Sequence, residues 1–243
     1  MSDFYSTLAD HYDELFGCGD QTIAFLREEG AGPGARVLDV ACGTGACTRL
    51  LLDRGVDAHG ADLSEPMVEI ARSRARAAGF DPGRFTVGDM LEIDEHPACP
   101  FRLVFCIGNS VSHLATMAEV ERFVAAAARV LERPGGRLVL QFVDVAAVPV
   151  GAQKVLPNLT SPRAVMHRVY HRVSRSRIRF DASLVVQGTV GQQISQDLLV
   201  ISTGEVAALL ARQGFAAIGA YGGFDRSAPV PERWVRVVSG ELS

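Results

Sequence analysis

The segment VLDVACGTG, residues 37–45, restricts the fold more than any other part of this chain. An apolar run leads directly into Gly43-Thr44-Gly45, and a helical pattern begins at residue 46. Glycines let the backbone turn sharply and approach a ligand closely, and a helix N-terminus aims amide donors at that ligand. In an open α/β sheet, such a loop lies at the carboxyl ends of the strands. The segment therefore predicts a strand, a ligand-binding turn and a helix.

The residues around this segment repeat the same alternation. Short apolar runs alternate with helical patterns, which is typical of βαβ units and a parallel sheet. Five nearly continuous apolar strands, as expected for burial on both faces, are predicted at residues 36–41, 56–61, 84–87, 101–107 and 137–143. Helices are predicted at residues 46–54, 65–78 and 117–131, with one or two more in residues 5–29. Ser64 is placed to cap the helix at 65–78, and its first turn tolerates Pro66.

The pattern changes after residue 145. Residues 146–162 contain three prolines and predict a loop-rich insertion. Residues 164–201 hold three β-like stretches that are too close together for helical crossovers, so antiparallel pairing is expected. Ser202-Thr-Gly-Glu205 predicts a capping box on a helix that runs through Arg212 and is terminated by Gly214. Two last strands, at 215–221 and 234–238, are expected to pair as a hairpin, with Tyr221 and Trp234 in the core.

These patterns predict four parts of the chain. Residues 1–30 form an N-terminal helical lid, and residues 31–145 form the ligand-binding α/β core. Residues 146–201 form a small antiparallel β cap over the substrate, and residues 202–243 complete the core sheet with a helix and a hairpin.

Composition narrows the class of protein. The formal net charge is -4 and the isoelectric point is near 5.9, which disfavours duplex nucleic acid because phosphate neutralisation needs clustered Lys and Arg. No apolar run approaches the roughly 20 residues that span a bilayer, and the N-terminus lacks the apolar segment of a signal peptide. We therefore expect a cytoplasmic protein without a membrane partner.

The cysteines are scattered and form no C-x-x-C pair. An odd number at irregular spacing predicts free thiols in a reducing compartment rather than a disulfide framework. A zinc site lacks both the spacing and the partners, so no metal is expected. The residues concerned are Cys18, Cys42, Cys47, Cys99 and Cys106.

Acids at the ends of the predicted strands indicate what the glycine turn binds. A dinucleotide motif would need a third glycine where Thr48 stands, and Asp39 would lie unfavourably beside a pyrophosphate. Asp62 ends the second strand, about where a ribose-binding acid belongs, and Asp89 follows the third. Carboxylates in this crevice favour a ligand that carries positive charge.

The glycine loop with its three spaced acids resembles class I S-adenosylmethionine (SAM)-dependent methyltransferases over residues 30–145. The resemblance implies a doubly wound, seven-stranded Rossmann-like α/β sheet with SAM as the co-substrate, and here a β cap is inserted after strand five. Bracing of the loop is the alternative role for Asp39. Arg102 stands where many members carry an acid, away from the crevice, so no functional consequence is expected. The implied cofactor-binding residues are Tyr12, Asp39, Ala41, Gly43, Gly45, Asp62, Leu63, Asp89, Met90, Ile107 and Ser110.

The string GNSVSHL, residues 108–114, is similar to the corresponding segment of glycine and sarcosine N-methyltransferases. That resemblance implies that Ile107 and Ser110 touch the cofactor, while Asn109 and His113 face the substrate. Chemistry also favours His113, because an acceptor amine or hydroxyl loses a proton and an imidazole with a pKa near 6.5 suits its removal. Packing of His113 against its own loop is the alternative.

Further polar residues are weaker candidates. Tyr12 resembles the tyrosine that folds over the methionine part of SAM in related chains, and it is a third catalytic candidate, with helix packing as the alternative. His11 is expected to be exposed to solvent. His167 and His171 fall on one strand face, where a solvated surface is favoured over a substrate wall.

The sequence thus predicts methyl transfer to a nitrogen or oxygen of a small-molecule metabolite, such as an amino acid, an amino sugar or a secondary-metabolite intermediate. The GNSVSHL resemblance favours nitrogen. An RNA methyltransferase, an NAD-dependent oxidoreductase and a catalytically silent SAM-binding protein are the alternatives. A monomer and a homodimer both fit the sequence.

Overall fold

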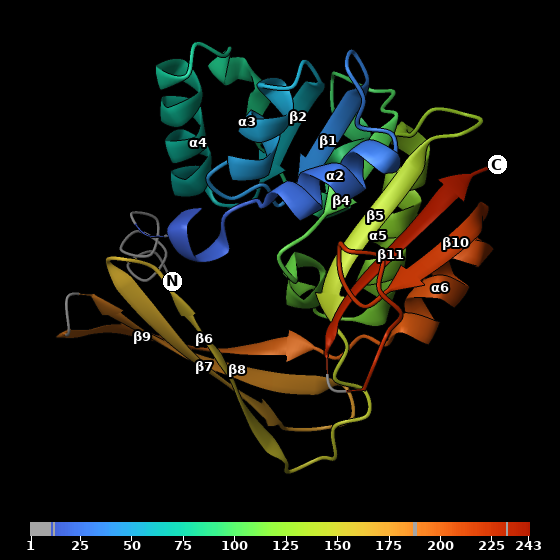
Figure 1. The fold of residues 1–243 in the computed structure, drawn as a ribbon. Helices are drawn as coiled ribbons and strands as arrows, with labels where there is room; N and C mark the ends of the chain where they lie inside the picture. Colours follow the sequence, from blue (N-terminus) through green and yellow to red (C-terminus); the bar gives the residue numbers. More distant parts are fainter. Residues whose placement is uncertain (1–10, 12, 187–188, 232) are drawn as a thin grey trace.

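The larger of two sheets forms the centre of the molecule (Figure 1). The computed structural model describes residues 11, 13–186, 189–231 and 233–243, without the side chains of residues 95, 190 and 192. The seven strands have the order β10-β11-β5-β4-β1-β2-β3. Strands β1 to β5 pair in parallel, whereas β11 runs antiparallel to both β5 and β10. Their bounds are β1 Arg36–Val40, β2 Asp57–Asp62, β3 Phe85–Val87, β4 Leu103–Cys106, β5 Arg137–Val143, β10 Phe215–Tyr221 and β11 Val235–Leu242.

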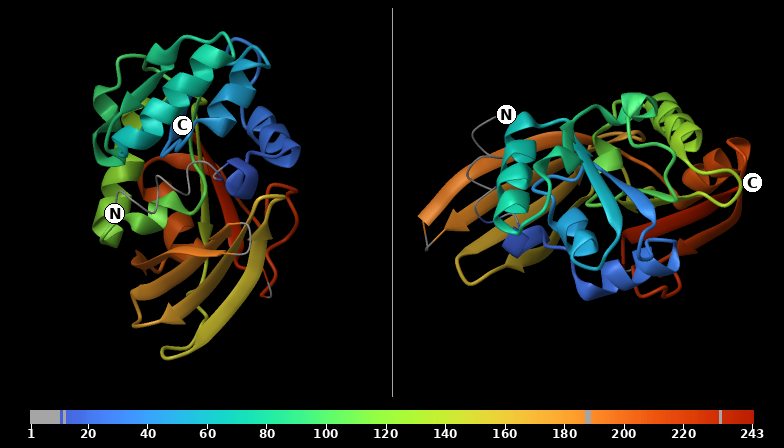
Figure 2. Two further views of the ribbon diagram at one scale, coloured as in Figure 1. Left: turned by 90° about the vertical axis from the view of Figure 1, so that its left-hand side faces the viewer. Right: turned by 90° about the horizontal axis from the view of Figure 1, so that it is seen from above.

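Helices cover both faces of this sheet, because alternate residues of each strand are apolar on opposite faces. Leu38 and Val40 pack toward helices α5 and α6, while Val37 packs toward α2 and α3. Figure 2 shows the same two helical layers from the side. The helices are α2 Asp20–Glu28, α3 Ala46–Leu52, α4 Glu65–Ala77, α5 Met117–Val130 and α6 Thr203–Arg212, with 3-10 turns η1 Pro82–Arg84, η2 Met90–Glu95 and η3 Ser110–His113. The predicted doubly wound α/β fold is confirmed.

A second, four-stranded antiparallel sheet follows β5 in the chain, and we call it the inserted sheet. Its order is β6-β7-β8-β9, and in Figure 1 it lies below the carboxyl ends of the parallel strands. Its bounds are β6 Gln153–Thr160, β7 Ala164–Arg172, β8 Arg177–Val186 and β9 Thr189–Leu199. The predicted antiparallel pairing is confirmed, whereas the prediction of a loop-rich segment at 146–162 was wrong for the residues of β6. Pro157 lies at a register shift in this edge strand, where proline is tolerated.

Of the two predicted N-terminal helix caps, that of α6 is confirmed and the side-chain cap of α4 was wrong. Ser202 accepts a hydrogen bond from the backbone of Glu205, and the Glu205 carboxylate accepts from the Ser202 backbone, which completes the predicted capping box of α6. Ser64 is the N-cap of α4, but its side chain makes no capping hydrogen bond. The Ser64 backbone N–H instead donates to the Asp62 carboxylate, which connects the start of α4 to the end of β2.

The prediction of free thiols was wrong for two of the five cysteines. Cys18 and Cys47 form a disulfide with their Cα atoms 5.0 Å apart. Cys18 precedes α2 and Cys47 lies in the first turn of α3, and these two helices pack side by side on one face of the sheet. The spacing of 29 residues gave no sign of this contact because tertiary packing creates it.

His11 was expected at the surface, but it is buried. The residues beside it are held between the two sheets, because Leu15 packs against the inserted sheet while Asp13 bonds to the glycine loop. Tyr221 and Trp234 are half-buried against apolar clusters. Within the part of the chain that the structure describes, no helix has the length and apolar character needed to cross a membrane.

Candidate functional site

The glycine loop between β1 and α3 turns through three residues in the left-handed backbone region. Ala41, Gly43 and Gly45 have φ values of 61°, 55° and 73°. A side chain at Gly45 would place its Cβ 2.5 Å from the Phe85 ring, so only glycine fits there. The loop therefore runs as bare backbone over the carboxyl ends of β1 and β2, where a ligand can approach it closely.

Asp62, at the end of β2, fixes this loop. One carboxylate oxygen accepts from the Gly43 N–H at 2.8 Å, and the other accepts from the Ser64 N–H at 2.8 Å. Burial raises the pKa of Asp62 above its usual value. Each oxygen keeps a second lone pair, which can accept from ligand hydroxyls. The next residue, Leu63, is 72% exposed and presents an apolar surface beside these acceptors.

Asp39 lies beneath the loop and is buried. The Thr48 hydroxyl donates to its carboxylate at 2.8 Å. Burial raises the pKa of Asp39 to about 7, against the opposing effect of the Thr48 bond. Thr48 stands where a dinucleotide motif would have its third glycine, so this departure from the motif has a structural reason. The Thr48 bond also gives physical support to the bracing role for Asp39.

Asp89 and Met90 follow β3 at the same edge of the sheet. Asp89 is the N-cap of η2, and its carboxylate accepts from the Leu91 N–H at 2.9 Å. Met90 is half-buried against the large apolar cluster. Val87, at the end of β3, is 47% exposed and extends the apolar surface that Leu63 begins.

The segment after β4 is held by side-chain oxygens. Asn109 has a φ of 65°, and its carbonyl oxygen accepts from the Val143 N–H and the Ser112 hydroxyl, both at 2.9 Å. The Ser110 hydroxyl donates to the Ile107 carbonyl at 3.0 Å. The amide oxygen of Asn109 therefore braces the segment, and its NH₂ group is the part that a substrate can meet.

His113 lies at the end of this segment and connects the two sheets. Its Nδ1 lies 3.0 Å from the side-chain amide of Gln196 on β9. Surrounding protein atoms partly remove the water around the His113 ring, which lowers its pKa, whereas the nearby charge of Asp62 raises that pKa. His113 keeps solvent contact. The structure thus brings an imidazole, the Asp62 carboxylate and the inserted sheet to one edge of the core.

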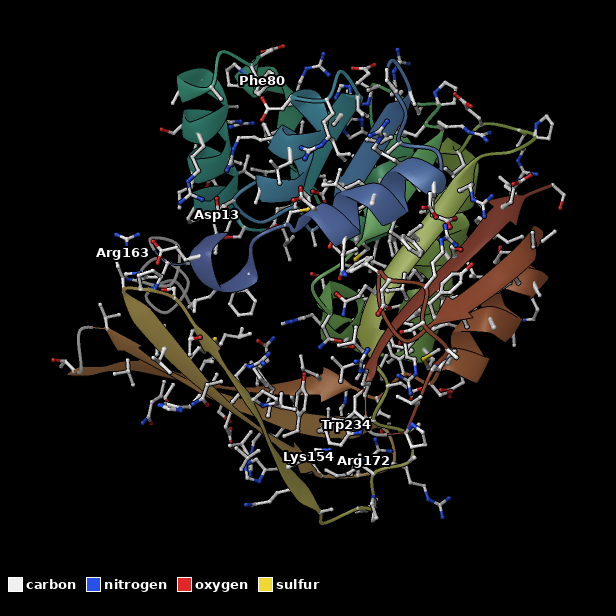
Figure 3. The ribbon with its side chains drawn as sticks, viewed as in Figure 1. Asp13, Phe80, Lys154, Arg163, Arg172 and Trp234 are labelled. Atoms are coloured by element: carbon white, nitrogen blue, oxygen red, sulfur yellow. A yellow bond between two sulfur atoms is a disulfide. The ribbon has the colours of Figure 1, made fainter. Side chains whose placement is uncertain are left out.

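Two residues near the crevice were missed by the sequence analysis. The Thr44 hydroxyl donates to Asp13, which also pairs with Arg49 at 3.0 Å and Arg74 at 2.8 Å. Asp13 is labelled in Figure 3. Gln141 accepts from the Gly108 N–H at 2.6 Å. Asp13 follows Tyr12, so the signal was present in the same motif. Tyr12 itself lies outside the described residues.

The predicted site residues at the carboxyl edge of the sheet have the chemistry that a SAM molecule requires. Ordered carboxylates, bare loop backbone and the exposed side chains of Leu63 and Val87 meet at one edge. Such a combination suits a ligand with hydroxyls, positive charge and a flat ring. Among the described residues, no group of three or more His, Cys, Asp or Glu is placed to hold a metal ion.

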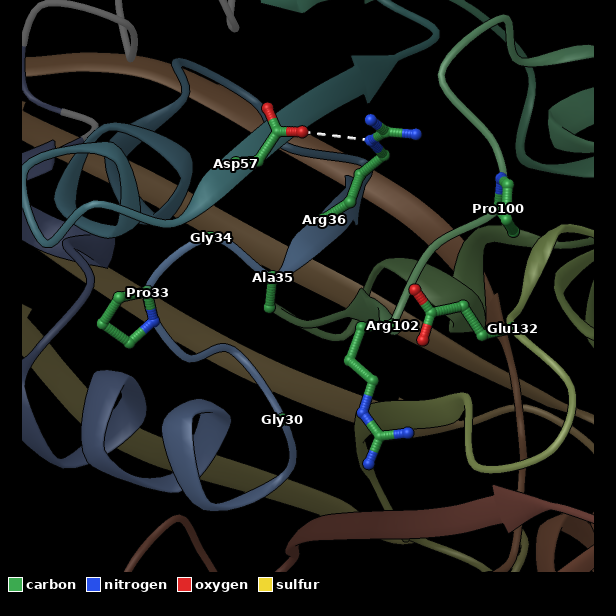
Figure 4. A pocket seen from close by; sticks show the side chains of 9 residues that line it. All are labelled: Gly30, Pro33, Gly34, Ala35, Arg36, Asp57, Pro100, Arg102 and Glu132. Carbon is green, nitrogen blue, oxygen red and sulfur yellow. Dashed lines mark hydrogen bonds and ion pairs between the residues drawn. The ribbon is translucent and has the colours of Figure 1, made fainter.

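A separate open pocket of about 580 Å³ lies at the opposite edge of the sheet (Figure 4). Its lining includes Arg36 and Asp57, which begin β1 and β2, and Arg102, which precedes β4. Arg36 pairs with Asp57 at 3.0 Å. Because ligands of such sheets bind at the carboxyl ends, this pocket is not the candidate active site. Arg102 lies at the far edge, as expected from the sequence.

Residues 37–136 match a family of methyltransferase domains. This part of the chain is therefore similar to methyltransferase domains, and the chain has the fold of class I SAM-dependent methyltransferases. A SAM-dependent methyltransferase from Clostridium acetobutylicum ATCC 824 superposes with a TM-score of 0.79 at 17% identity, covering 99% of this chain and 100% of the other.

Two curated relatives match the core at higher identity. A demethylmenaquinone methyltransferase from Tropheryma whipplei (strain Twist) is 38% identical over 111 residues, which are 46% of this chain and 43% of that protein. Glycine N-methyltransferase from Rattus norvegicus is 32% identical over 127 residues, which are 49% of this chain and 42% of that protein. The chain spans under half the length of either relative.

Proposed function

We propose that this protein transfers a methyl group from SAM to a nitrogen or oxygen of a small-molecule metabolite, with nitrogen favoured. The observation that carries the proposal is the position of His113, which lies at the carboxyl edge of the parallel strands and contacts Gln196 of the inserted sheet. The matches to demethylmenaquinone and glycine N-methyltransferases support a small acceptor.

SAM supplies a methyl group that is already activated by its sulfonium charge. The residues proposed to hold it are those at the carboxyl edge: Asp62 accepts from the ribose, Asp89 accepts from the adenine amino group, and Leu63 and Met90 cover the ring. The negative field of Asp39 favours the ammonium and sulfonium charges. Ala41, Gly43, Gly45, Ile107 and Ser110 contribute backbone and small side chains, and Tyr12 covers the methionine part.

The protein must then align the acceptor atom, exclude water and remove a proton. His113 is the proposed proton acceptor, through Nε2. If the Gln196 amide turns its oxygen to the ring, it accepts the Nδ1 proton and leaves a lone pair on Nε2. Asn109 presents its NH₂ group to the acceptor. The lowered pKa of His113 keeps the imidazole neutral near pH 7, as this role requires.

A ligand-binding comparison tests the cofactor assignment. The protein should bind SAM and S-adenosylhomocysteine with micromolar affinity, on the order of -8 kcal/mol, and NAD far more weakly in the same calorimetric titration. Asp62→Ala should weaken both SAM and S-adenosylhomocysteine by about 10-fold or more, because it removes a buried acceptor. Preferential binding of NAD would favour the oxidoreductase alternative.

Turnover tests the role of His113. We expect His113→Asn to bind SAM normally and to lose about 100-fold or more in turnover, as is typical when a general base is removed. A SAM-consumption screen of amines, amino acids, hydroxy acids, phenols and RNA supplies the substrate for this assay. Near wild-type turnover in the variant would make His113 a packing residue. SAM binding without turnover on any acceptor would favour the silent alternative.

A further inference from the structure

Strand register defines two faces of the inserted sheet. Arg168 pairs with Ala182, which pairs with Ile194, so these three residues share one face. One step along the strands, Tyr170, Phe180 and Gln196 form the next row of the same face. Because Gln196 contacts His113 of the core, this face is turned toward the carboxyl edge of the large sheet. We call it the inner face.

The inner face has cations without acids. Its described side chains include Lys154, Arg168 and Arg172, and strand alternation places no carboxylate of the described residues of β6 to β9 on it. The outer face is different, because Asp181 there pairs with His171 at 2.9 Å and with Arg179 at 3.6 Å. In a protein whose formal net charge is -4, the inner face is a local concentration of positive charge.

Arg168 makes fewer hydrogen bonds through its guanidinium than Arg172 does. One guanidinium NH₂ group donates to the Pro157 carbonyl at 2.8 Å. Its Nε is buried and has no hydrogen-bond partner, and burial lowers the pKa of Arg168. The Nε of Arg172 is likewise buried without a partner, but the two NH₂ groups of that guanidinium both donate, to the carbonyls of Val145 and Arg175. A buried donor without a partner is unfavourable, so the Arg168 site is incomplete without an acceptor.

Aromatic side chains lie beside this cation. Tyr170 is 5.3 Å from Phe180 and 6.5 Å from Trp234 between ring centroids. Lys154, across from Tyr170 in the register, lies 4.0 Å over the Trp234 ring (Figure 3). The inner face therefore offers two cations, Arg168 and Lys154, together with an apolar aromatic surface.

We propose that Arg168 and Lys154 bind an oxyanion of the methyl acceptor, a carboxylate or a phosphate, while an apolar part of the same molecule lies against Phe180, which the buried Tyr170 supports from the side. This inference rests on the proposed function. Across the sheet, strand spacing puts the Cα atoms of Arg168 and Gln196 about 12 Å apart. An acceptor with its anion at Arg168 and its nucleophilic atom at His113 is thus an elongated small molecule.

Fluorescence of Trp234 tests the inference without knowledge of the natural substrate. It is the sole tryptophan of the chain and contacts Lys154, so its emission should respond to an anion there. The probes are benzoate, phenyl phosphate and neutral benzyl alcohol, titrated in the presence of S-adenosylhomocysteine. We expect at least one anion to bind about 10-fold or more tightly than benzyl alcohol, and the better anion identifies the carboxylate or phosphate preference.

Four variants test where the anion binds. Arg168→Gln should lose the preference for the anion, and Arg179→Gln on the outer face should keep it as the matched control. Arg168→Lys and Lys154→Gln, each expected to retain part of the preference, keep the test decisive if Arg168→Gln does not fold. Equal binding of anions and benzyl alcohol, or unchanged anion affinity in the Arg168 variants, would overturn the inference. Calorimetry with S-adenosylhomocysteine is the separate measurement: failure of wild-type binding there contradicts the proposed function instead.

Discussion

The two sheets treat their charged groups in opposite ways. At the carboxyl edge of the large sheet, each acid has a donor from the protein itself: Thr48 for Asp39, the Gly43 and Ser64 backbone for Asp62, and the Leu91 backbone for Asp89. On the inner face of the inserted sheet, Arg168 has a buried Nε without a partner.

This difference separates two kinds of binding surface. The acids of the large sheet are oriented by the protein itself, so the cofactor site that we propose there is pre-formed. The inner face lacks a counter-charge among its described residues, so a ligand must supply it. A methyltransferase fold with an insertion would combine a cofactor site on the common sheet with an acceptor site on the variable insertion.

The largest expected effect concerns Asp39, because burying its carboxylate lowers the free energy of unfolding above pH 7. Its pKa is raised to about 7 by burial, against 3.8 for the free side chain. The folded protein therefore binds a proton between about pH 4 and 7 that the unfolded chain releases, so stability falls as pH rises through this range and is constant above it. We expect Asp39→Asn to raise the free energy of unfolding at pH 8 by at most about 4 kcal/mol, and to weaken SAM binding about 10-fold or more.

Urea unfolding at pH 5 and pH 8 checks the first part, and calorimetry with SAM checks the second. The gain should be larger at pH 8 than at pH 5. Asp53→Asn, which changes an exposed carboxylate at the end of α3, is the matched control. A variant with greater stability and undiminished SAM affinity would assign Asp39 to bracing alone.

The sequence predicted the large sheet well because its signals are local. The glycine turn comes at the end of β1, Asp62 is the last residue of β2, and Asp89 lies two residues after β3. Parallel strands bring these carboxyl ends to one edge. The contact of Gln196 with His113 joins residues 83 positions apart, and no local pattern encodes it.

Strand β6 and the disulfide were missed for related reasons. Pro157 is typical of a loop, and only its position at a bulge in an edge strand makes it compatible with pairing. Cys18 and Cys47 meet because α2 and α3 share one face of the sheet. Both features depend on tertiary packing, which spacing along the chain does not reveal.

The second prediction tests the connection between the two sheets. The N-terminal segment joins them, because Asp13 bonds to the core while Glu14 pairs at 2.5 Å with Arg163, in the turn between β6 and β7. The Cys18–Cys47 disulfide anchors the chain just after this segment. We expect the double variant Cys18→Ser, Cys47→Ser to lose about 2–4 kcal/mol of unfolding free energy, since the bridge closes a loop in the unfolded chain.

Urea unfolding of the oxidised protein, the reduced protein and the double variant measures this loss. Cys99→Ser, at an exposed free thiol, is the control and should leave stability unchanged. Equal stability of oxidised and reduced protein would mean that the disulfide does not restrict the unfolded chain.

The smallest expected effect sharpens the comparison at its one point of contact, where Gln196 of the inserted sheet meets His113. Gln196→Glu puts a carboxylate about where the amide lies, which favours the charged imidazole and raises the pKa of His113 by about 1 unit. The acidic limb of the kcat/KM profile should then move to higher pH by the same amount. Gln196→Leu removes the polar partner and should move that limb to lower pH.

Ser195→Ala is the control: Ser195 is next to Gln196 in the sequence, but its side chain lies on the outer face, so this variant should leave the acidic limb in place. If Gln196 had only a structural role, both variants would change stability and the acidic limb would stay in place in each. Opposite shifts in the two variants, measured with one substrate across pH, are the result expected if the inserted sheet tunes the base of the core.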